Sequence, residues 1–92
     1  MARSPLHATH PDIIKRLKRA GGHLGTIIEM IEADRACLEL AQQLHAVEKA
    51  IASAKKTLIH DHIDHCLDET LRGDGTTSQK TLNEFKEITK YL

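Results

Sequence analysis

Two cysteines and one histidine have the residue types and the spacing of a metal site. His62 and Cys66 are four residues apart, so on a helix they share one face and lie one turn from each other. Cys37 lies 25 residues before His62, a separation of about 37 Å along one helix. The three side chains therefore cannot bind the same ion within one chain. Two long helices paired antiparallel would bring Cys37 to His62 and Cys66 of the partner subunit, twice in a symmetric dimer.

Two thiolates and one imidazole form a soft set of three ligands. Such a set favours Cu(I), which is stable as a trigonal or linear thiolate complex, whereas Zn(II) prefers a fourth ligand. We also expect a partner that forms a hydrogen bond with the ring nitrogen of His62 that does not bind metal. The spacing alone leaves another interpretation open, in which Cys37 and Cys66 are small buried side chains or redox thiols.

Three helices are expected to position these residues, which makes the fold class all-α. The first begins near His10, at a Pro-Asp pair typical of helix N-termini, and ends at a break over residues 33–35. From about residue 36 to residue 71 no glycine or proline interrupts the chain, and apolar residues keep helical spacing. This pattern predicts one long central helix. Residues 72–77 form a turn, after which a short third helix carries a periodic apolar stripe.

Glycines are concentrated in one turn of the first helix, within residues 21–25. Each weakens a helix by up to about 1 kcal/mol relative to alanine. A close contact between helices would explain why they are tolerated, and a kink or poor packing at this point is the alternative.

The long central helix indicates oligomerisation. A helix of about 36 residues is about 54 Å long, whereas a folded chain of this size is about 25–30 Å across. The first helix can cover only part of the apolar face of such a helix. We therefore expect further copies of the chain to cover the rest.

Composition excludes several classes of protein. The chain has 92 residues and a mass of 10.3 kDa, which fits a single domain over residues 1–92. Only 2% of the residues are aromatic, so the core must be aliphatic, and this scarcity argues against a base-stacking reader of single strands. The sequence contains no apolar run of membrane-spanning length and no signal peptide, which predicts a cytoplasmic protein. It also lacks a phosphate-binding loop and a nucleophile–base pattern, so we do not expect an enzyme.

The charges sum to zero but are grouped along the chain. Five basic side chains lie within residues 1–28, and acidic side chains dominate residues 29–48. This segregation allows one face of the protein to be basic, so the zero net charge does not exclude DNA as a partner. His23 and His45 lie among apolar neighbours and are expected to pack or to face DNA rather than to bind metal.

Three segments of the chain resemble one known family. Residues 10–24 (HPDIIKRLKRAGGHL), 37–48 (CLELAQQLHAVE) and 58–66 (LIHDHIDHC) are similar to the copper-sensitive operon repressors. This family also has relatives that sense nickel or cobalt, formaldehyde and persulfides. The resemblance covers residues 10–71 well and the third helix loosely. A cysteine followed after 25 residues by a histidine, and after four more by a second cysteine, is the fingerprint of the copper branch.

The resemblance implies a fold, a partner and a mode of action. It implies a homodimer with antiparallel long helices, two of which assemble into a disc-like homotetramer. The protein would be a cytoplasmic repressor that binds operator DNA when metal-free and is released when Cu(I) binds Cys37, His62 and Cys66 between subunits. DNA would lie across a basic face. By resemblance that face would use six side chains, namely Arg16, Lys18, Arg19, Lys49, Lys55 and Lys56.

The sequence also departs from the pattern of the copper branch. Members often have a tyrosine before the first cysteine and a glutamate in the third helix, both beside the metal ligands. Here Ala36 precedes Cys37, and Glu84 is the nearest candidate for the glutamate. In addition, His7 and His10 occur where nickel-sensing relatives supply an N-terminal ligand. His7 belongs to residues 1–9, which are expected to be a flexible arm, and His10 follows directly after them. A fourth ligand from either histidine would suit Ni(II) or Zn(II).

Three further alternatives remain open. Cys37 and Cys66 of facing subunits could react with sulfur species, as in a persulfide sensor, although that chemistry does not need His62. A formaldehyde sensor is not expected to have the second cysteine. A helical metal-buffering protein that never contacts DNA would not need the basic residues at 15–19.

Overall fold

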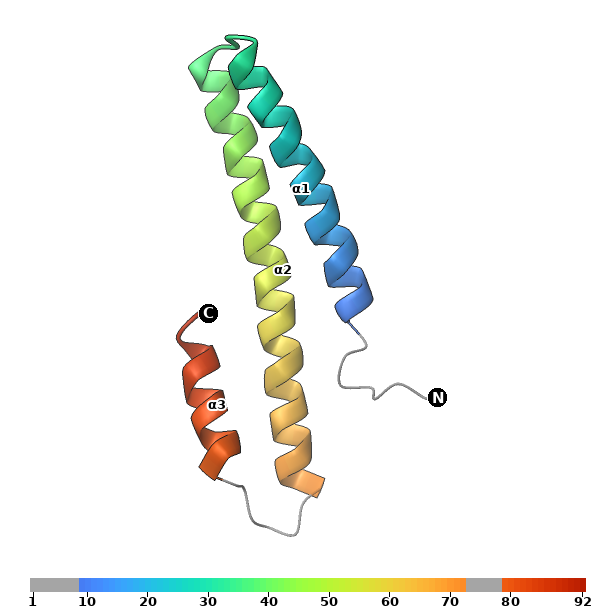
Figure 1. Cartoon of the computed structure of the whole chain (residues 1–92). Coiled ribbons are helices and arrows are strands. Elements are labelled where there is room, and N and C mark those ends of the chain that lie inside the picture. The colour runs from blue at the N-terminus through green and yellow to red at the C-terminus, as the bar shows by residue number, and fades with distance from the viewer. Residues whose placement is uncertain (1–8, 73–78) are drawn as a thin grey trace. The chain divides into compact units, whose positions relative to one another are not determined.

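The protein consists of three helices (Figure 1). The computed structural model describes residues 9–72 and 79–92, with side chains described over 9–65 and 79–92. Helix α1 extends over His10–Glu32, α2 over Cys37–Arg72 and α3 over Gln79–Thr89, and the described residues contain no strand. The predictions of an all-α chain and of a long central helix, here 36 residues, are confirmed. Most of the expected N-terminal arm lies outside the described residues.

The chain divides into two compact units, and α2 contributes to both. One unit is Pro11–Ala54, and the other combines Lys55–Leu92 with Met1–His10. Each unit contains one part of α2 with another helix beside it. The expectation that residues 1–92 work as a single domain remains a prediction.

In the unit Pro11–Ala54, α1 lies antiparallel to the first part of α2 (Figure 1). Ala20 and Ile27 of α1 form a buried cluster with Val47 of α2, and Leu40 packs against it. Ile13 is also buried, so the buried positions of α1 recur every seven residues along one face. The core of this hairpin is aliphatic, as the scarcity of aromatic residues predicted.

The break between α1 and α2 is a defined helix cap. The backbone N–H of Arg35 donates to the carbonyl of Met30 over 3.1 Å, and that of Asp34 donates to the carbonyl of Ile31 over 3.1 Å. These two bonds are those of a Schellman motif, in which the residue after the helix adopts a left-handed conformation. Asp34 does so with φ of 57°, a conformation that aspartate tolerates better than most residues. The break predicted over residues 33–35 is confirmed.

A second apolar seam of α1 is exposed to solvent in the described part of the chain. Its residues follow one another at alternating steps of three and four, with Gly21 as the third of six positions. This spacing is typical of a seam between paired helices. The exposed members are Ile14, Leu17, Leu24, Ile28 and Ile31. On α2 of the same unit, Leu44 and Ile51 are exposed as well.

The glycines of α1 make no close helix–helix contact within the described protomer. A Cβ atom added at Gly21, Gly22 or Gly25 would meet nothing within 4 Å in the described part of the chain. The close contact expected at these glycines therefore stays a prediction. All three positions lie on exposed parts of α1.

In the other unit, α3 lies beside the C-terminal part of α2 (Figure 1). The expected apolar stripe of α3 is only partly covered, because Phe85 and Ile88 are half-buried and Leu82 is exposed. No described residue of α3 is fully buried. Across both units, no described helix combines the length and the apolarity that crossing a membrane requires.

Candidate metal centre and nucleic-acid interface

Cys37 is the first residue of α2, and its side chain is exposed. The carbonyl of Ala36 accepts the first hydrogen bond of this helix, from the N–H of Leu40 over 3.0 Å. The side chains of two residues that flank Cys37 form a hydrogen bond, in which Nε of Arg35 donates to Oε2 of Glu39 over 3.2 Å. The cysteine thus stands at an ordered helix start, where its thiol can reach a group outside the protomer.

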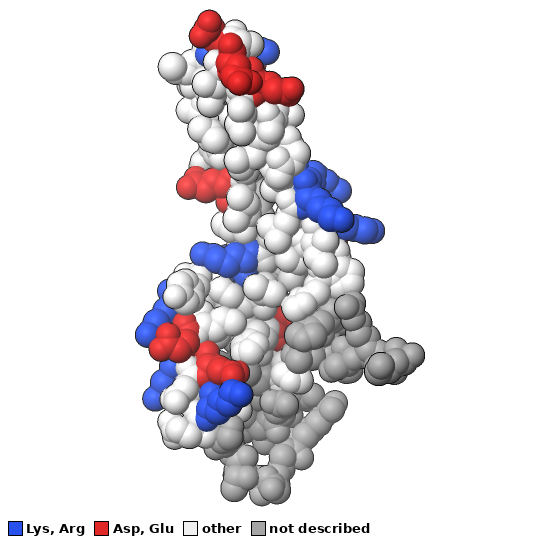
Figure 2. Space-filling view, viewed as in Figure 1, with Lys and Arg blue, Asp and Glu red and all other residues white. Residues whose placement is uncertain are grey.

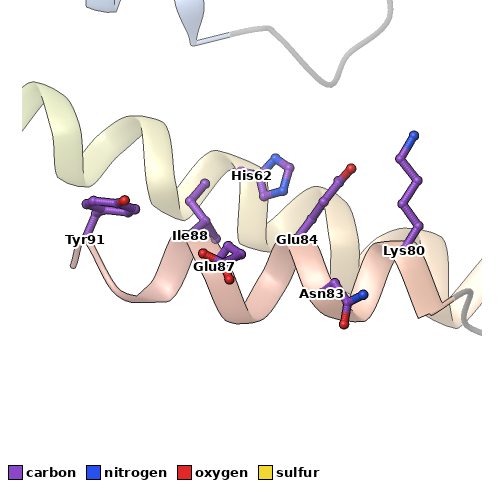
Figure 3. Close-up of a pocket in the computed structure, with 7 residues that line it drawn as sticks. All are labelled: His62, Lys80, Asn83, Glu84, Glu87, Ile88 and Tyr91. Atoms are coloured by element: carbon purple, nitrogen blue, oxygen red, sulfur yellow. The ribbon is translucent and has the colours of Figure 1, made fainter.

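His62 lies further along α2 and faces α3 across a pocket of about 660 Å³ (Figure 3). Its side chain is half-buried. Figure 3 shows His62 and Glu84 entering this space from the two helices. The other lining residues, all from α3 or the residues after it, are Lys80, Asn83, Glu87, Ile88 and Tyr91. The structure therefore brings His62 and Glu84, both singled out from the sequence, to one pocket.

The remaining predicted metal ligands are less completely described. Cys66 belongs to α2, one helical turn after His62, but its side chain lies outside the described residues. His7 also lies outside them, whereas His10 is the half-buried first residue of α1. Within the described side chains, no group of three or more histidine, cysteine or acidic residues could hold a metal ion. The ligand set Cys37, His62 and Cys66 stays a prediction.

The basic residues expected to contact DNA are all exposed. They are Arg16, Lys18 and Arg19 on α1 and Lys49, Lys55 and Lys56 on α2. Arg16 forms an ion pair with Asp12, one turn earlier, with 2.9 Å between Nε and Oδ2. This carboxylate competes with any phosphate for the guanidinium of Arg16.

The two arginines of this set, Arg16 and Arg19, lie at a groove between α1 and α2 in the unit Pro11–Ala54. The groove has a volume of about 380 Å³ and is lined by Arg16, Arg19, Ala20, His23, Ala50 and Ser53. Nε2 of His23 lies 2.6 Å from Oε1 of Gln43, a hydrogen bond between the two helices. Sequence reasoning missed this groove, although the recurrence of residues 16, 19, 20 and 23 at helical spacing places them on one face.

Charge is separated along the same unit (Figure 2). Acidic side chains gather near the connection between α1 and α2, and basic side chains lie further along α1. The segregation seen in the sequence is therefore present on the surface of this unit.

A family model described as metal-sensitive transcriptional repressor matches residues 9–91. The chain belongs to this family. The match extends through all three helices, α3 included. Because the metal-sensitive transcriptional repressor family consists of regulators of transcription, the prediction that the chain is not an enzyme is confirmed.

Several relatives of the chain in this repressor family are named copper-sensing repressors. The chain is 36% identical to the copper-sensing transcriptional repressor CsoR of Bacillus subtilis over 80 residues, covering 85% of this chain and 79% of the relative. It is 34% identical to the CsoR of Mycobacterium ulcerans over 79 residues, covering 85% of this chain and 65% of the relative. The chain is 33% identical to the copper-sensing transcriptional repressor RicR of Mycobacterium tuberculosis over 70 residues, covering 76% of this chain and 73% of the relative.

The chain thus spans slightly less than two thirds of the length of the Mycobacterium ulcerans relative. No solved structure matches it significantly.

Proposed function

We propose that this protein is a copper-responsive transcriptional repressor. In this proposal the metal-free protein binds operator DNA, and Cu(I) bound between subunits releases it. The observation that carries the proposal is the pattern Cys37, His62 and Cys66 in a chain whose relatives are named copper-sensing repressors. The residues 1–92 act together as one domain, in the cytoplasm, where the DNA is.

The donor set fits Cu(I). The two thiolates are soft ligands, the imidazole is a borderline ligand that also binds copper, and the three together complete a trigonal site without a water molecule. The exposure of Cys37 supports a role outside its own protomer, because a thiol that only filled a core would be covered. Cys37 and His62 are separated by about 37 Å of one helix, so the proposed site takes Cys37 from one protomer and the other two ligands from its partner.

Glu84 orients His62 in this proposal. A histidine that binds metal through one ring nitrogen commonly donates the other N–H to a carboxylate, which fixes the tautomer and raises the basicity of the ligand. The shared pocket of the two side chains supports this role. It would also link the ligand on α2 to the position of α3.

The homodimer and the homotetramer are supported by the uncovered seam of α1. Five large apolar side chains exposed at coiled-coil spacing are unusual on a helix that faces only water. A second copy of the chain, with a helix of the same pattern, would cover them. Sedimentation velocity of the metal-free protein is expected to give a tetramer, and a monomer at micromolar concentration would overturn the intersubunit site.

DNA binding in this proposal is electrostatic and is coupled to the metal site. Arg16, Lys18 and Arg19, with the lysines of α2, contact phosphates, and such contacts weaken steeply as salt rises. Bringing Cys37 of one protomer to the other two ligands in its partner fixes the geometry of the dimer. If DNA prefers a different geometry, then metal and DNA weaken each other's binding by the same coupling free energy.

A selected duplex can stand in for the operator in the test of this function. Duplexes are selected from a random-sequence pool with the reduced, metal-free protein, and binding is measured by fluorescence anisotropy under anaerobic conditions. Cu(I) at one equivalent per protomer is expected to release the selected duplex. Ni(II), Zn(II) and a persulfide donor are added separately.

Each rival function gives a different result. Release by Ni(II) or Zn(II) alone would overturn the choice of metal and make His7 and His10 the ligands to test. Release by the persulfide alone would favour thiol chemistry at Cys37 and Cys66. If no duplex is bound at any salt concentration, the protein is not a repressor.

A further inference from the structure

The groove between α1 and α2 places a histidine beside two arginines. Arg16, Arg19 and His23 line it from α1, whereas α2 lines it with Ala50 and Ser53. The charged or titratable groups that line the groove are therefore the two guanidinium groups and the imidazole, with Asp12 bound to Arg16 at its edge. A groove with this lining is complementary to an anion.

Gln43 determines how His23 can act. The amide oxygen Oε1 of Gln43 can only accept a hydrogen bond, so Nε2 of His23 must carry the hydrogen in this 2.6 Å contact. A neutral imidazole has one N–H, which Gln43 already accepts. The other nitrogen, Nδ1, then donates to an anion only when the ring is protonated.

We propose that His23 binds a phosphate of the DNA backbone in its protonated form, and that Gln43 holds the ring in position. This inference rests on the proposed DNA-binding function and adds a pH-dependent contact to it. Arg16 and Arg19 attract the phosphate into the groove, and the phosphate in turn favours the proton on His23. Binding of DNA should therefore take up a proton at His23.

The contact strengthens as pH falls, because only the protonated ring can donate to Gln43 and to a phosphate at once. The sign follows from linkage: a ligand that prefers the protonated protein binds more tightly at lower pH. A phosphate contact to a charged ring is worth about tenfold in affinity. At low pH, each such contact also makes the slope of log affinity against log salt concentration steeper by about 0.9.

The test compares DNA affinity at pH 6 and pH 8, using a duplex selected from a random-sequence pool and a second duplex of unrelated sequence. His23→Gln keeps a polar side chain and cannot become charged. Its gain in affinity from pH 8 to pH 6 is expected to be about tenfold smaller than that of the wild type. His45→Gln is the matched control. The sequence groups His45 with His23, but in the structure its side chain is exposed on α2, beside the carboxylate of Glu48 and outside the groove. It should follow the wild type on both duplexes.

Gln43→Met tests the positioning role, since it keeps the length of the side chain and removes the acceptor oxygen. It is expected to lose part of the pH-dependent gain while circular dichroism and melting temperature stay close to those of the wild type. If His23→Gln gains as much affinity at pH 6 as the wild type does, the inference is overturned and the repressor function stands. If the wild type binds neither duplex, both are overturned.

Discussion

His62 of α2 and Glu84 of α3 line the same pocket, although 22 residues separate them in the sequence (Figure 3). A carboxylate in that position can accept the N–H of an imidazole whose other nitrogen binds metal. The position of α3 thus places a carboxylate at the pocket of the predicted metal ligand His62.

Replacing Glu84 should therefore weaken metal binding without affecting DNA binding. Glu84→Gln is expected to lower the affinity for Cu(I) by about 10- to 100-fold, as is usual when the partner of a metal-bound histidine is lost. Competition with a Cu(I) chelator measures the change. Glu87→Gln is the control on the same helix and in the same pocket, because the carboxylate of Glu87 is already paired with Lys90 at 3.1 Å. Equal losses in the two variants would argue against a specific role of Glu84.

Cys37 should be needed for the response to metal and not for DNA binding. Its side chain is exposed, so Cys37→Ala removes no buried contact within the protomer. We expect this variant to bind a selected duplex as the wild type does, and to remain bound when Cu(I) is added. Anisotropy with and without Cu(I) checks both parts. Loss of DNA binding by a folded Cys37→Ala protein would show that the two roles are not separate.

Asp12 should limit DNA affinity through its ion pair with Arg16. In Asp12→Asn the guanidinium is no longer paired over 2.9 Å and can turn to a phosphate. The slope of log affinity against log salt should become steeper by up to about 0.9 for each Arg16 at the DNA. The same change removes an acid from the first turn of α1, which should cost about 0.3–1 kcal/mol of stability. An unchanged slope would place Arg16 outside the DNA contact.

Ile27 should be the most sensitive position of the hairpin core, because only 2% of its surface is exposed. Ile27→Ala is expected to reduce the free energy of unfolding by about 2–5 kcal/mol. Ile28→Ala is the adjacent control, with 54% of Ile28 exposed in the protomer. If a second copy covers Ile28, that variant should mainly alter how the melting temperature depends on protein concentration. Thermal melts at several protein concentrations distinguish the two variants. If Ile27→Ala and Ile28→Ala changed stability and its dependence on concentration to the same extent, the assignment of one buried and one exposed seam would be contradicted.

Local chemistry was sufficient to predict the helices. The Pro-Asp pair after His10 predicted the start of α1, and the break at Asp34 follows from a residue that accepts a left-handed conformation. The uninterrupted stretch after Ala36 predicted a central helix, and the helix begins at Cys37. Helix boundaries are accessible from sequence because capping and helix breaking depend on a few adjacent residues.

The packing between helices was harder to predict from the sequence than the helix boundaries were. The sequence presents α1 as a helix with one broad apolar face, and only the structure separates the buried seam of Ile13 and Ile27 from the exposed seam of Ile14 and Ile28. The glycines of α1 also show this limit, because a small residue permits a close approach without requiring one, and no helix approaches them within the described protomer. The contact between His23 and Gln43 joins residues 20 positions apart, and no local pattern reports it. A site shared between subunits is also not contained in one chain.

The most direct test of the central claim is an anaerobic titration of the reduced protein with Cu(I) against a strong Cu(I) chelator. We expect the wild type to retain about one ion per protomer, as a symmetric dimer with two shared sites requires. Cys37→Ala and His62→Ala should each release the ion to the chelator. If the chelator takes all the Cu(I) from the wild type, or if both variants retain it, then Cys37, His62 and Cys66 do not form the copper site.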